Sequence, residues 1–397
     1  MPRLRAIAVA AAGLFVLPEA VRLATEGGVN APDWLAALAP GGSVDLPAAE
    51  PGGMPNAAAW QDLRGGGQRA TKLGKGVHSS VYSCHMDGRG DVAVKVVDIE
   101  NDAAKDHFER ERRFLTMFDG DDYVVGFHGA MTGTTKNHRR GLIFMERADG
   151  TLSDIIDARR KQGRSQRALV DSMAVGLAHD ILRGVDKLAE QQCAHHDIMP
   201  SNVLVFGNWR NGTARAKLGD FGHAVFAAMV KDNPFQDKMA RSTSMLSYAA
   251  PEYATGTGEM NARGYRRADM WSAGVVLTEL FSGSLPKGWQ RRTTADHWKQ
   301  DQDSNHRLLQ EHIQEKVDDA DARNLLFGML RAEPAQRWKH GYALHHIQQM
   351  AKSRGVEVPR KPKWWDVRNP FAFDEATPEE MRKAVQSALP WGWADLN

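Results

Sequence analysis

The chain has 397 residues, of which 42% are hydrophobic and 25% are charged, as is ordinary for a globular protein. Its 51 basic and 49 acidic residues leave a net charge of +2, which argues against a nucleic-acid-binding function. Two cysteines, Cys84 and Cys193, are too few for a disulfide framework, so we expect both to be small buried side chains. The length permits several average domains, or one large two-lobed domain with extensions.

Residues 1–17 predict a presequence. Arg3 and Arg5 precede the apolar run Ala6–Leu17, and the segment has no acidic residue. This pattern is typical of a secretory signal, and twelve apolar residues are too short for an ordinary membrane span. We therefore expect entry into the secretory pathway or a signal anchor in the membrane. The alternatives are an organelle presequence, next in order, and a short buried helix in a cytoplasmic protein.

Composition divides the rest of the chain into three segments. Residues 18–68 are rich in Ala, Pro and Gly and predict a linker without a core of its own. Residues 69–349 have the periodicity of a folded domain. Residues 350–397 form an extension with four tryptophans, in which the capping box Thr377–Glu380 predicts a helix to about Leu389. Because large aromatic side chains are seldom left in solvent, we expect this extension to pack on the domain, with partner binding as the alternative.

Within residues 69–349, strand patterns precede helix patterns. Residues 71–98 alternate apolar and polar side chains between glycines, and residues 123–147 also have strand patterns. Residues 103–118 are spaced as a charged amphipathic helix, and the periodicity is mostly helical after Thr151. We therefore predict an α+β fold with a small β-rich N-terminal lobe and a larger helical C-terminal lobe.

Glycines and a lysine in the first strands suggest a phosphate-binding site. Gly74 and Gly76 lie where a strand–turn–strand without side chains can approach phosphates closely, although an ordinary Gly-rich hairpin has the same pattern. Lys95 lies in an apolar strand, and burying its charge requires a partner. We expect that partner to be Glu111 on the predicted helix, with Glu109 as the alternative.

A loop followed by a glycine turn has the strongest chemical pattern. The loop is His195-His196-Asp197-Ile198-Met199-Pro200-Ser201-Asn202, and Asp220-Phe221-Gly222 begins eighteen residues after Asn202. Phosphoryl transfer to a hydroxyl needs one carboxylate to orient the hydroxyl, and an amide and a second carboxylate can hold Mg²⁺. An Asn211-Gly212 turn between two strand patterns predicts a hairpin that brings Asn202 and Asp220 together at its open end. Asn211-Gly212-Thr213 is also a glycosylation sequon.

Together these motifs resemble those of eukaryotic protein kinases. The loop resembles the kinase catalytic loop, and Asp220-Phe221-Gly222 resembles the metal-binding turn. Tyr248–Glu252 resembles the end of the activation segment, and Asp269 the aspartate that anchors the catalytic loop. Arg337 is the expected ion-pair partner of Glu252. Small-molecule kinases of related fold usually lack these last three features.

The resemblance implies a kinase that transfers the γ-phosphate of ATP to Ser or Thr of a protein substrate with Mg²⁺. Asp197 would be the base or orienting carboxylate and would act with Lys95 and Glu111, while Asn202 and Asp220 would hold the metal. The nucleotide would be bound by the first strands, a hinge and an adenine-pocket floor, which comprise Leu73, Gly74, Gly76, Val81, Ala93, Lys95, Met145, Glu146, Ala148 and Leu204. Met145 would be the gatekeeper, and backbone groups of Glu146 and Ala148 would meet the adenine.

Two positions depart from the family pattern. His196 replaces an Arg that usually pairs with a phosphate in the activation segment, so phosphorylation at residues 242–244 is expected to matter less. Met199 replaces a Lys that steadies the γ-phosphate, and Met245 replaces the Thr that this Lys reaches. The loss of this charge is expected to lower the rate without abolishing the chemistry. We expect a catalyst; the alternative is a pseudokinase that acts as a nucleotide-binding scaffold or regulator of a partner.

Three further patterns bear on ligands and partners. Cys193, His195 and His196 have the composition of a metal site, but the resemblance gives His195 a buried structural role. The basic run Arg159–Lys161, with Arg164 and Arg167, suggests an acidic partner or, alternatively, a solvated loop. We expect a protein substrate, no nucleic acid, and membrane contact only through the N-terminal segment.

Overall fold

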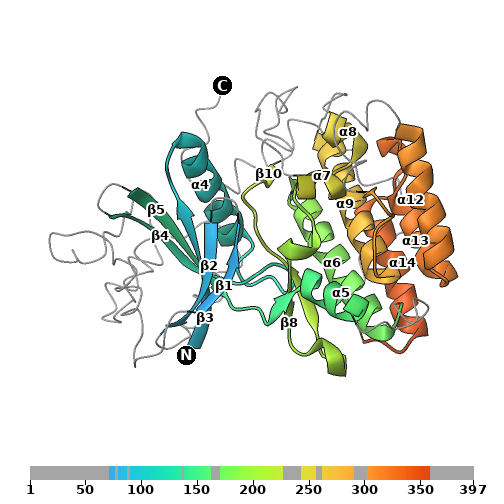
Figure 1. The fold of residues 1–397 in the computed structure, drawn as a ribbon, viewed down its shortest axis with the longest axis horizontal. Coiled ribbons are helices and arrows are strands. Elements are labelled where there is room, and N and C mark those ends of the chain that lie inside the picture. The colour runs from blue at the N-terminus through green and yellow to red at the C-terminus, as the bar shows by residue number, and fades with distance from the viewer. Residues whose placement is uncertain are drawn as a thin grey trace, which may run out of the picture. The chain divides into compact units, whose positions relative to one another are not determined.

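The computed structural model of the chain describes residues 71–76, 79–86, 90–135, 138–161, 170–226, 243–255, 262–289 and 302–357. These residues form two compact units, drawn in Figure 1. The strand unit comprises the described residues up to Gly120 and Gly126–Arg147, and the helical unit comprises Asp121–Val125 and the described residues from Ala148 onward. The presequence, the linker and the helix predicted near residues 378–389 lie outside the described residues.

An antiparallel sheet and one helix make up the strand unit. Its elements are β1 (Thr71–Lys75), β2 (Ser79–Met86), β3 (Gly90–Asp98), α4 (Asp102–Met117), β4 (Phe127–Thr135) and β5 (His138–Glu146). The sheet order is β1-β2-β3-β5-β4, and every neighbouring pair is antiparallel. The antiparallel strands predicted for this part of the chain are confirmed.

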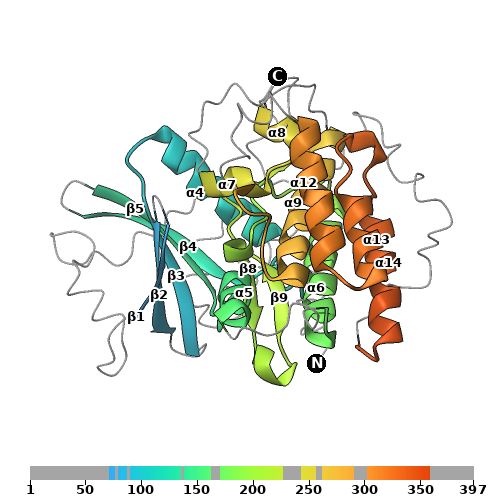
Figure 2. The same cartoon turned by 45° about the vertical axis from the view of Figure 1, so that its right-hand side comes forward.

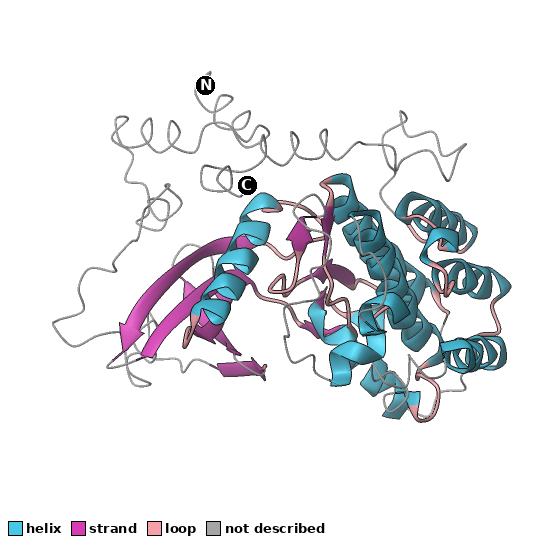
Figure 3. Cartoon of the chain, turned by 90° about the horizontal axis from the view of Figure 1, so that it is seen from above, coloured by secondary structure: helices cyan, strands magenta, loops and turns pink. Residues whose placement is uncertain are grey.

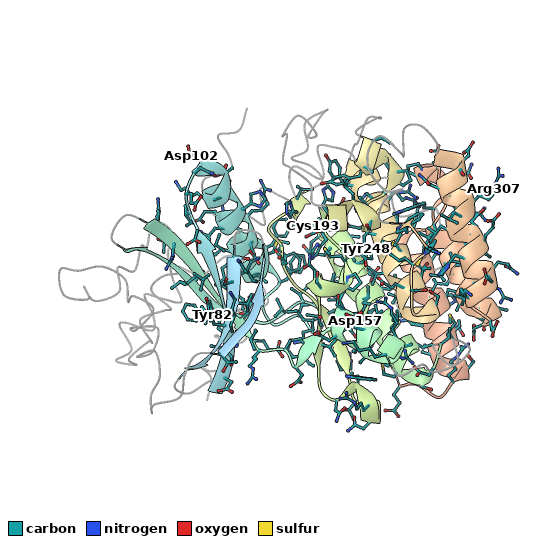
Figure 4. All side chains as sticks on the ribbon, in the orientation of Figure 1. Tyr82, Asp102, Asp157, Cys193, Tyr248 and Arg307 are labelled. Atoms are coloured by element: carbon teal, nitrogen blue, oxygen red, sulfur yellow. The ribbon has the colours of Figure 1, made fainter. Side chains whose placement is uncertain are left out.

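The register of the central strands sorts their side chains onto the two faces of the sheet. Val92 and Val94 of β3 join Leu142 and Phe144 of β5 in an apolar cluster, and Tyr82, labelled in Figure 4, packs against it. Successive residues of a strand point to opposite faces. Lys95, between Val94 and Val96, therefore belongs to the other face of the sheet.

Helix α4 packs on the strands through one stripe of side chains. Its buried residues, Phe108, Glu111, Phe114 and Leu115, recur at the spacing of one helical face. The ring of Phe108 fills the space that a side chain on Gly141 of β5 would need: a Cβ placed there would be 2.4 Å from the ring. Figure 3 shows α4 alongside the strands of this unit. The Gly141 contact lets the helix approach the sheet closely.

The helical unit contains short strands and most of the helices (Figure 2). Its elements, with η for 3₁₀ helices, are β6 (Gly150–Thr151), α5 (Leu152–Lys161), α6 (Ser172–Glu190), β7 (Cys193–Ala194), η3 (Pro200–Asn202), β8 (Val203–Phe206), η4 (Trp209–Asn211), β9 (Arg215–Leu218), β10 (Val225–Phe226), α7 (Thr243–Tyr248), α8 (Pro251–Thr255), α9 (Ala262–Ser282), α12 (Gln302–Lys316), α13 (Ala320–Met329), η7 (Pro334–Gln336) and α14 (His340–Ser353). None of the helices in the described ranges is long and apolar enough to cross a membrane.

Helix α6 is the core of this unit and contacts α9, α14 and β9. It begins at the cap Asp171, whose carboxylate accepts a hydrogen bond from the Ala174 N–H at 2.8 Å. Two buried carboxylates on α6 each have a cation: Asp180 binds Arg215 at 2.7 Å, and Asp186 binds Arg183 at 3.1 Å. Because unpaired buried charges are costly, these pairs explain how a helix with such residues can be so deeply buried.

Candidate active site

The buried lysine of β3 has the partner expected for it. Lys95 Nζ lies 2.8 Å from both carboxylate oxygens of Glu111, and both residues are buried. The alternative partner, Glu109, instead accepts two bonds from Arg112 at 2.8 and 3.0 Å. The expected Lys95–Glu111 pair is therefore present, and the Glu109 alternative is wrong. A bidentate pair of this kind fixes the ammonium at one point on the sheet.

The other candidate nucleotide-binding residues of the strand unit lie on β1, β2, β3 and β5. Gly74 faces Val81 across the β1–β2 pair, Lys95 also faces Val81, and Ala93 faces Met145. A Cβ on Gly74 would have no atom within 4 Å, so this stretch of β1 is open. Leu73 is exposed, whereas Ala93 and Met145 are buried. Glu146 follows Met145, and its N–H donates to the Gly126 carbonyl at 2.9 Å.

Gly76 closes the β1–β2 turn with a bond from its N–H to the Ser79 carbonyl at 2.8 Å. A Cβ at Gly76 would lie only 2.8 Å from the Ser79 hydroxyl, so that hydroxyl would have to move to admit a side chain. The two residues between them, 77 and 78, are outside the described ranges. The glycine turn thus brings backbone close to backbone at its end, as an ordinary Gly-rich hairpin also does, and its close approach to phosphates stays a prediction.

In the helical unit, a buried histidine connects the loop of residues 195–202 to the turn before Phe221. The Nδ1 atom of His195 accepts from the Asp197 N–H at 3.3 Å, and its Nε2 lies 3.1 Å from the Gly219 carbonyl. A ring whose Nδ1 accepts must carry its proton on Nε2, which then donates to Gly219. Both ring nitrogens are thereby occupied, and the described part of the chain has no cluster of three or more His, Cys, Asp or Glu side chains that could hold a metal ion.

Asp269 holds the backbone of the same loop. Its carboxylate accepts from the N–H of His195 at 2.6 Å and from the N–H of His196 at 2.9 Å. Complete burial raises the pKa of Asp269 to about 7, against the opposing effect of these two bonds. The anchoring role implied by the kinase resemblance is therefore matched by two direct contacts.

Asn202 orients the candidate base. Its Nδ2 donates to the Asp197 carbonyl and to Asp197 Oδ2, both at 2.8 Å. Because the amide nitrogen is used for Asp197, the amide oxygen is the atom that Asn202 can offer to a cation. Asp197 and Asn202 are both partly exposed. The loop therefore combines a positioned carboxylate with an oxygen ligand.

Asp220 follows β9 in an uncommon backbone conformation. Its φ of 63° lies in the left-handed region, where non-glycine residues are infrequent and cluster at functional sites. The N–H of Gly219 donates to the Asn202 carbonyl at 2.9 Å, and β8 pairs with β9 in register from Val203 and Leu218. The predicted hairpin is thus confirmed, and Asn202 and Asp220 flank its open end, Asn202 just before β8 and Asp220 two residues after β9.

Leu204 and Ala148 are the remaining candidate nucleotide residues, and both belong to the helical unit. Leu204 is half-buried on β8 and lies against Gly219, where a Cβ would come within 2.9 Å of its side chain. Ala148 is also half-buried and precedes β6. Because Gly219 has no side chain, it leaves room for Leu204. Gly219 is the residue directly before Asp220, the second candidate metal ligand.

His196 packs between aromatic rings. Its imidazole stacks on Tyr265 at a centroid distance of 4.3 Å and an interplanar angle of 7°, and Tyr253 meets it edge-on at 5.2 Å. Its backbone is left-handed, with φ of 65°. The sequence marked His196 as a departure but gave no signal for its neighbours, because Tyr253 and Tyr265 are far along the chain.

A buried ion pair anchors α8. Arg337 binds both oxygens of Glu252 at 2.6 and 2.7 Å, as predicted, and its guanidinium lies 5.0 Å from the ring centroid of Trp271. It also donates to the carbonyls of Arg331 and Ala332 at 2.7 and 3.0 Å. The guanidinium is thus satisfied on several sides, which offsets the cost of its complete burial.

The basic run of residues 159–161 is helical rather than a loop; Arg160 and Lys161 are exposed, and the partners of Arg159 and Arg160 lie within the chain. It is the end of α5, where Arg159 is buried and paired with Asp171. Arg160 binds Glu279 at 3.2 Å, and Glu279 also accepts from the Tyr248 hydroxyl at 2.7 Å. Sequence analysis missed this chain of contacts, because the partners are distant in sequence. Arg164, Arg167 and the side chain of Met245 are outside the described residues.

The segment before α8 has a second anchor. The indole N–H of Trp289 donates to the Ser247 carbonyl at 2.8 Å, and both residues are buried. Burial and the neighbouring carboxylate of Glu279 raise the pKa of Tyr248, so its hydroxyl remains a donor. Tyr248 is labelled on the helical unit in Figure 4. These contacts fix residue 248, the first of the stretch that resembles the end of a kinase activation segment, and residue 247 just before it.

Comparison with known proteins identifies the class to which this fold and these contacts belong. Residues 68–349 match the family model of the protein kinase domain, and the chain therefore belongs to the protein kinase family. Its mixed α+β organisation, with an antiparallel sheet region followed by a helical region, agrees with that family.

Individual relatives include both tyrosine and serine/threonine kinases. The chain is 30% identical to tyrosine-protein kinase JAK3 of Rattus norvegicus, over 53% of this chain and 18% of that protein. It is 27% identical to mitogen-activated protein kinase kinase kinase 17 of Arabidopsis thaliana, over 55% and 52%. It is 28% identical to serine/threonine-protein kinase hippo of Drosophila melanogaster, over 55% and 29%. The chain thus spans between about a fifth and a half of the length of these relatives.

Proposed function

We propose that this chain is an active protein kinase that transfers the γ-phosphate of ATP to a serine or threonine of a protein substrate. The observation that carries the proposal is the pairing of Asn202 with Asp197, which orients a carboxylate and leaves an amide oxygen for a cation. The buried Lys95–Glu111 pair supports it from the strand unit. A scaffold without catalysis has no need of both arrangements.

The residues fit magnesium by their chemistry. Mg²⁺ prefers oxygen ligands and is usually bound by one or two carboxylates or amides together with substrate phosphates. Asn202 and Asp220 supply an amide oxygen and a carboxylate from adjoining strand ends. When bound, the metal neutralises charge on the phosphates. Asn202 and Asp220 would hold it there.

Each chain residue has one task in the proposed reaction. Asp197 accepts a hydrogen bond from the substrate hydroxyl and takes its proton as the new oxygen–phosphorus bond forms. The bond between the γ-phosphorus and the bridging oxygen breaks, and ADP leaves with that electron pair. Lys95, held by Glu111, binds the phosphates that remain with ADP. Leu73, Val81, Ala93, Met145 and Leu204 would enclose the adenine, with backbone groups of Glu146 and Ala148 at its edge.

A phosphotransfer assay on the purified full chain tests this proposal. The chain is incubated with γ-labelled ATP, Mg²⁺ or Mn²⁺ and a general protein substrate, beside the Asp197→Asn and Asp220→Ala variants. We expect label transfer by the wild type and a loss of at least about a hundredfold in both variants, because a positioned base or metal ligand is removed. Asp303→Asn, an exposed carboxylate on α12, is the matched control and should keep wild-type activity.

Acid hydrolysis of the labelled product distinguishes the kind of acceptor. Phosphoserine or phosphothreonine is expected, and phosphotyrosine alone would contradict the serine/threonine assignment. Transfer by none of the proteins, with the wild type still folded and binding ATP, would favour the alternative of a nucleotide-binding scaffold. That alternative rests on Met199, which leaves the loop without the lysine usual in serine/threonine kinases.

A further inference from the structure

The outer turn of the β8–β9 hairpin is an exposed surface that has no part in the proposed phosphotransfer. It contains η4 and lies at the lower edge of the helical unit in Figures 1 and 2. Asn211, Gly212 and Thr213 are all exposed there. They form an Asn-x-Thr sequon, and no other Asn-x-Ser/Thr sequence without proline at x occurs in the 397 residues.

The turn folds the asparagine side chain against the threonine. Asn211 Oδ1 accepts from the Thr213 hydroxyl at 2.7 Å and from the Thr213 N–H at 3.2 Å. Gly212 between them has φ of 79°, which a residue with a side chain would adopt only with strain. A Cβ at Gly212 would have no atom within 4 Å, so the middle of the sequon is open.

These bonds leave the reactive atom of Asn211 uninvolved in holding the turn. Both contacts of its carboxamide are made by Oδ1, and within the described residues no hydrogen bond involves its Nδ2. Nδ2 is the atom to which a sugar is attached in an N-linked glycan. A substituent on it would preserve both bonds to Thr213.

We propose that Asn211 carries an N-linked glycan. The chain would acquire this glycan in the secretory pathway, which it enters through residues 1–17. The second, independent support is the composition of that segment, with Arg3 and Arg5 before the apolar run Ala6–Leu17. The donor is a lipid-linked oligosaccharide diphosphate. A bond forms between Asn211 Nδ2 and C1 of the first sugar, and the bond between C1 and the diphosphate oxygen breaks. The lipid diphosphate leaves with that electron pair, and a base of the transferring enzyme takes the Nδ2 proton.

A glycan at this position is compatible with the candidate active site. Phe206 faces Arg215 at the turn end of the hairpin, whereas Val203 faces Leu218 at the other end, beside Asn202. Three steps along a strand separate these pairs by about 10 Å. The sugar would therefore extend from the end of the hairpin that is remote from the candidate metal ligands.

Expression of the full chain in eukaryotic cells tests the proposal. We expect one glycosylated band that an N-glycan-releasing amidase converts to a faster one. Release in heavy-oxygen water should label residue 211, as read by peptide mass spectrometry. Asn211→Gln and Thr213→Ala should each abolish the slower band, and Thr213→Ser, which restores a hydroxyl, should retain it. Asn208→Gln, in the same turn but outside the sequon, is the matched control and should keep the glycan.

Deletion of residues 1–17 tests the route and should abolish the glycan. An unmodified Asn211 in the full chain overturns the proposal, and a glycan that persists after the deletion overturns its statement about the presequence. Neither result bears on phosphotransfer, which is measured separately on Asp197 and Asp220 variants.

Discussion

Two side chains of the candidate site, His195 and Asn202, each make two hydrogen bonds that position the loop of residues 195–202. His195 uses one ring nitrogen for the Asp197 N–H and the other for the Gly219 carbonyl, so a single residue fixes the loop relative to the turn. Asn202 uses its amide nitrogen twice on Asp197. Such pre-organised groups lose little freedom when substrate binds, which is the general advantage of a positioned catalytic carboxylate.

Met199 is the position where a single side chain is expected to limit the rate. It is partly exposed, in an extended residue just before η3. Met199→Lys should raise kcat for phosphotransfer by about tenfold or more, because a cation would stabilise negative charge developing on the transferred group. Steady-state kinetics with ATP and a protein substrate measure this. Met199→Leu, which preserves size without charge, should leave kcat near the wild-type value, and an unchanged kcat in Met199→Lys would show that the missing charge is not limiting.

Helix α9 contributes at the scale of an element, because one turn of it supports the loop of residues 195–202 through Asp269. The raised pKa of Asp269 means that the folded protein retains a proton that the unfolded chain releases from about pH 4 upward. Stability from this group is therefore fully present below about pH 4 and is lost as pH rises to about 7. Above pH 7 no further change is expected from this carboxyl.

Asp269→Asn should remove this slope. The stability advantage of the wild type over the variant is expected to be greater at pH 5 than at pH 8, by about 2 kcal/mol at one shifted carboxyl. Urea unfolding of both full chains at the two pH values measures the difference, and histidines that titrate in the same range cancel between them. Equal differences at pH 5 and pH 8 would contradict the raised pKa of Asp269. Asp303→Asn should show no such dependence.

At the scale of elements, most strand and helix boundaries could be predicted from the sequence. Antiparallel strands over residues 71–98 and 123–147 and a helix over residues 103–118 follow from local periodicity, which the sheet and α4 confirm. The choice between Glu109 and Glu111 was also open to sequence reasoning. Phe108 and Glu111 are three residues apart and share a helical face, whereas Glu109 lies off it. The apolar stripe of α4 therefore favours Glu111 over Glu109 as the partner of Lys95.

At the scale of the whole molecule, contacts between distant segments decide what local patterns cannot. The order of motifs predicted the Glu252–Arg337 pair because the kinase resemblance supplied both partners. The burial of Arg159 by Asp171, the Arg160–Glu279–Tyr248 contacts and the stacking of Tyr265 on His196 had no such guide. A basic run has the same appearance in sequence whether its charges face solvent or internal carboxylates. Which residue pairs with a given charged side chain is therefore decided by the fold.

The fit of Phe108 against Gly141 has a genetic consequence. Gly141→Ala would place a methyl group where the ring lies and force α4 outward, and Glu111 is on that helix three residues beyond Phe108. Overpacking of this kind costs about 1–3 kcal/mol, enough to loosen the Lys95–Glu111 pair on heating without unfolding the chain when cool. We expect a temperature-sensitive allele: phosphotransfer near wild type at 20 °C and reduced at least about tenfold at 37 °C. Gly176→Ala on α6, where the added carbon meets only an ordinary contact at 3.8 Å, should behave as wild type at both temperatures.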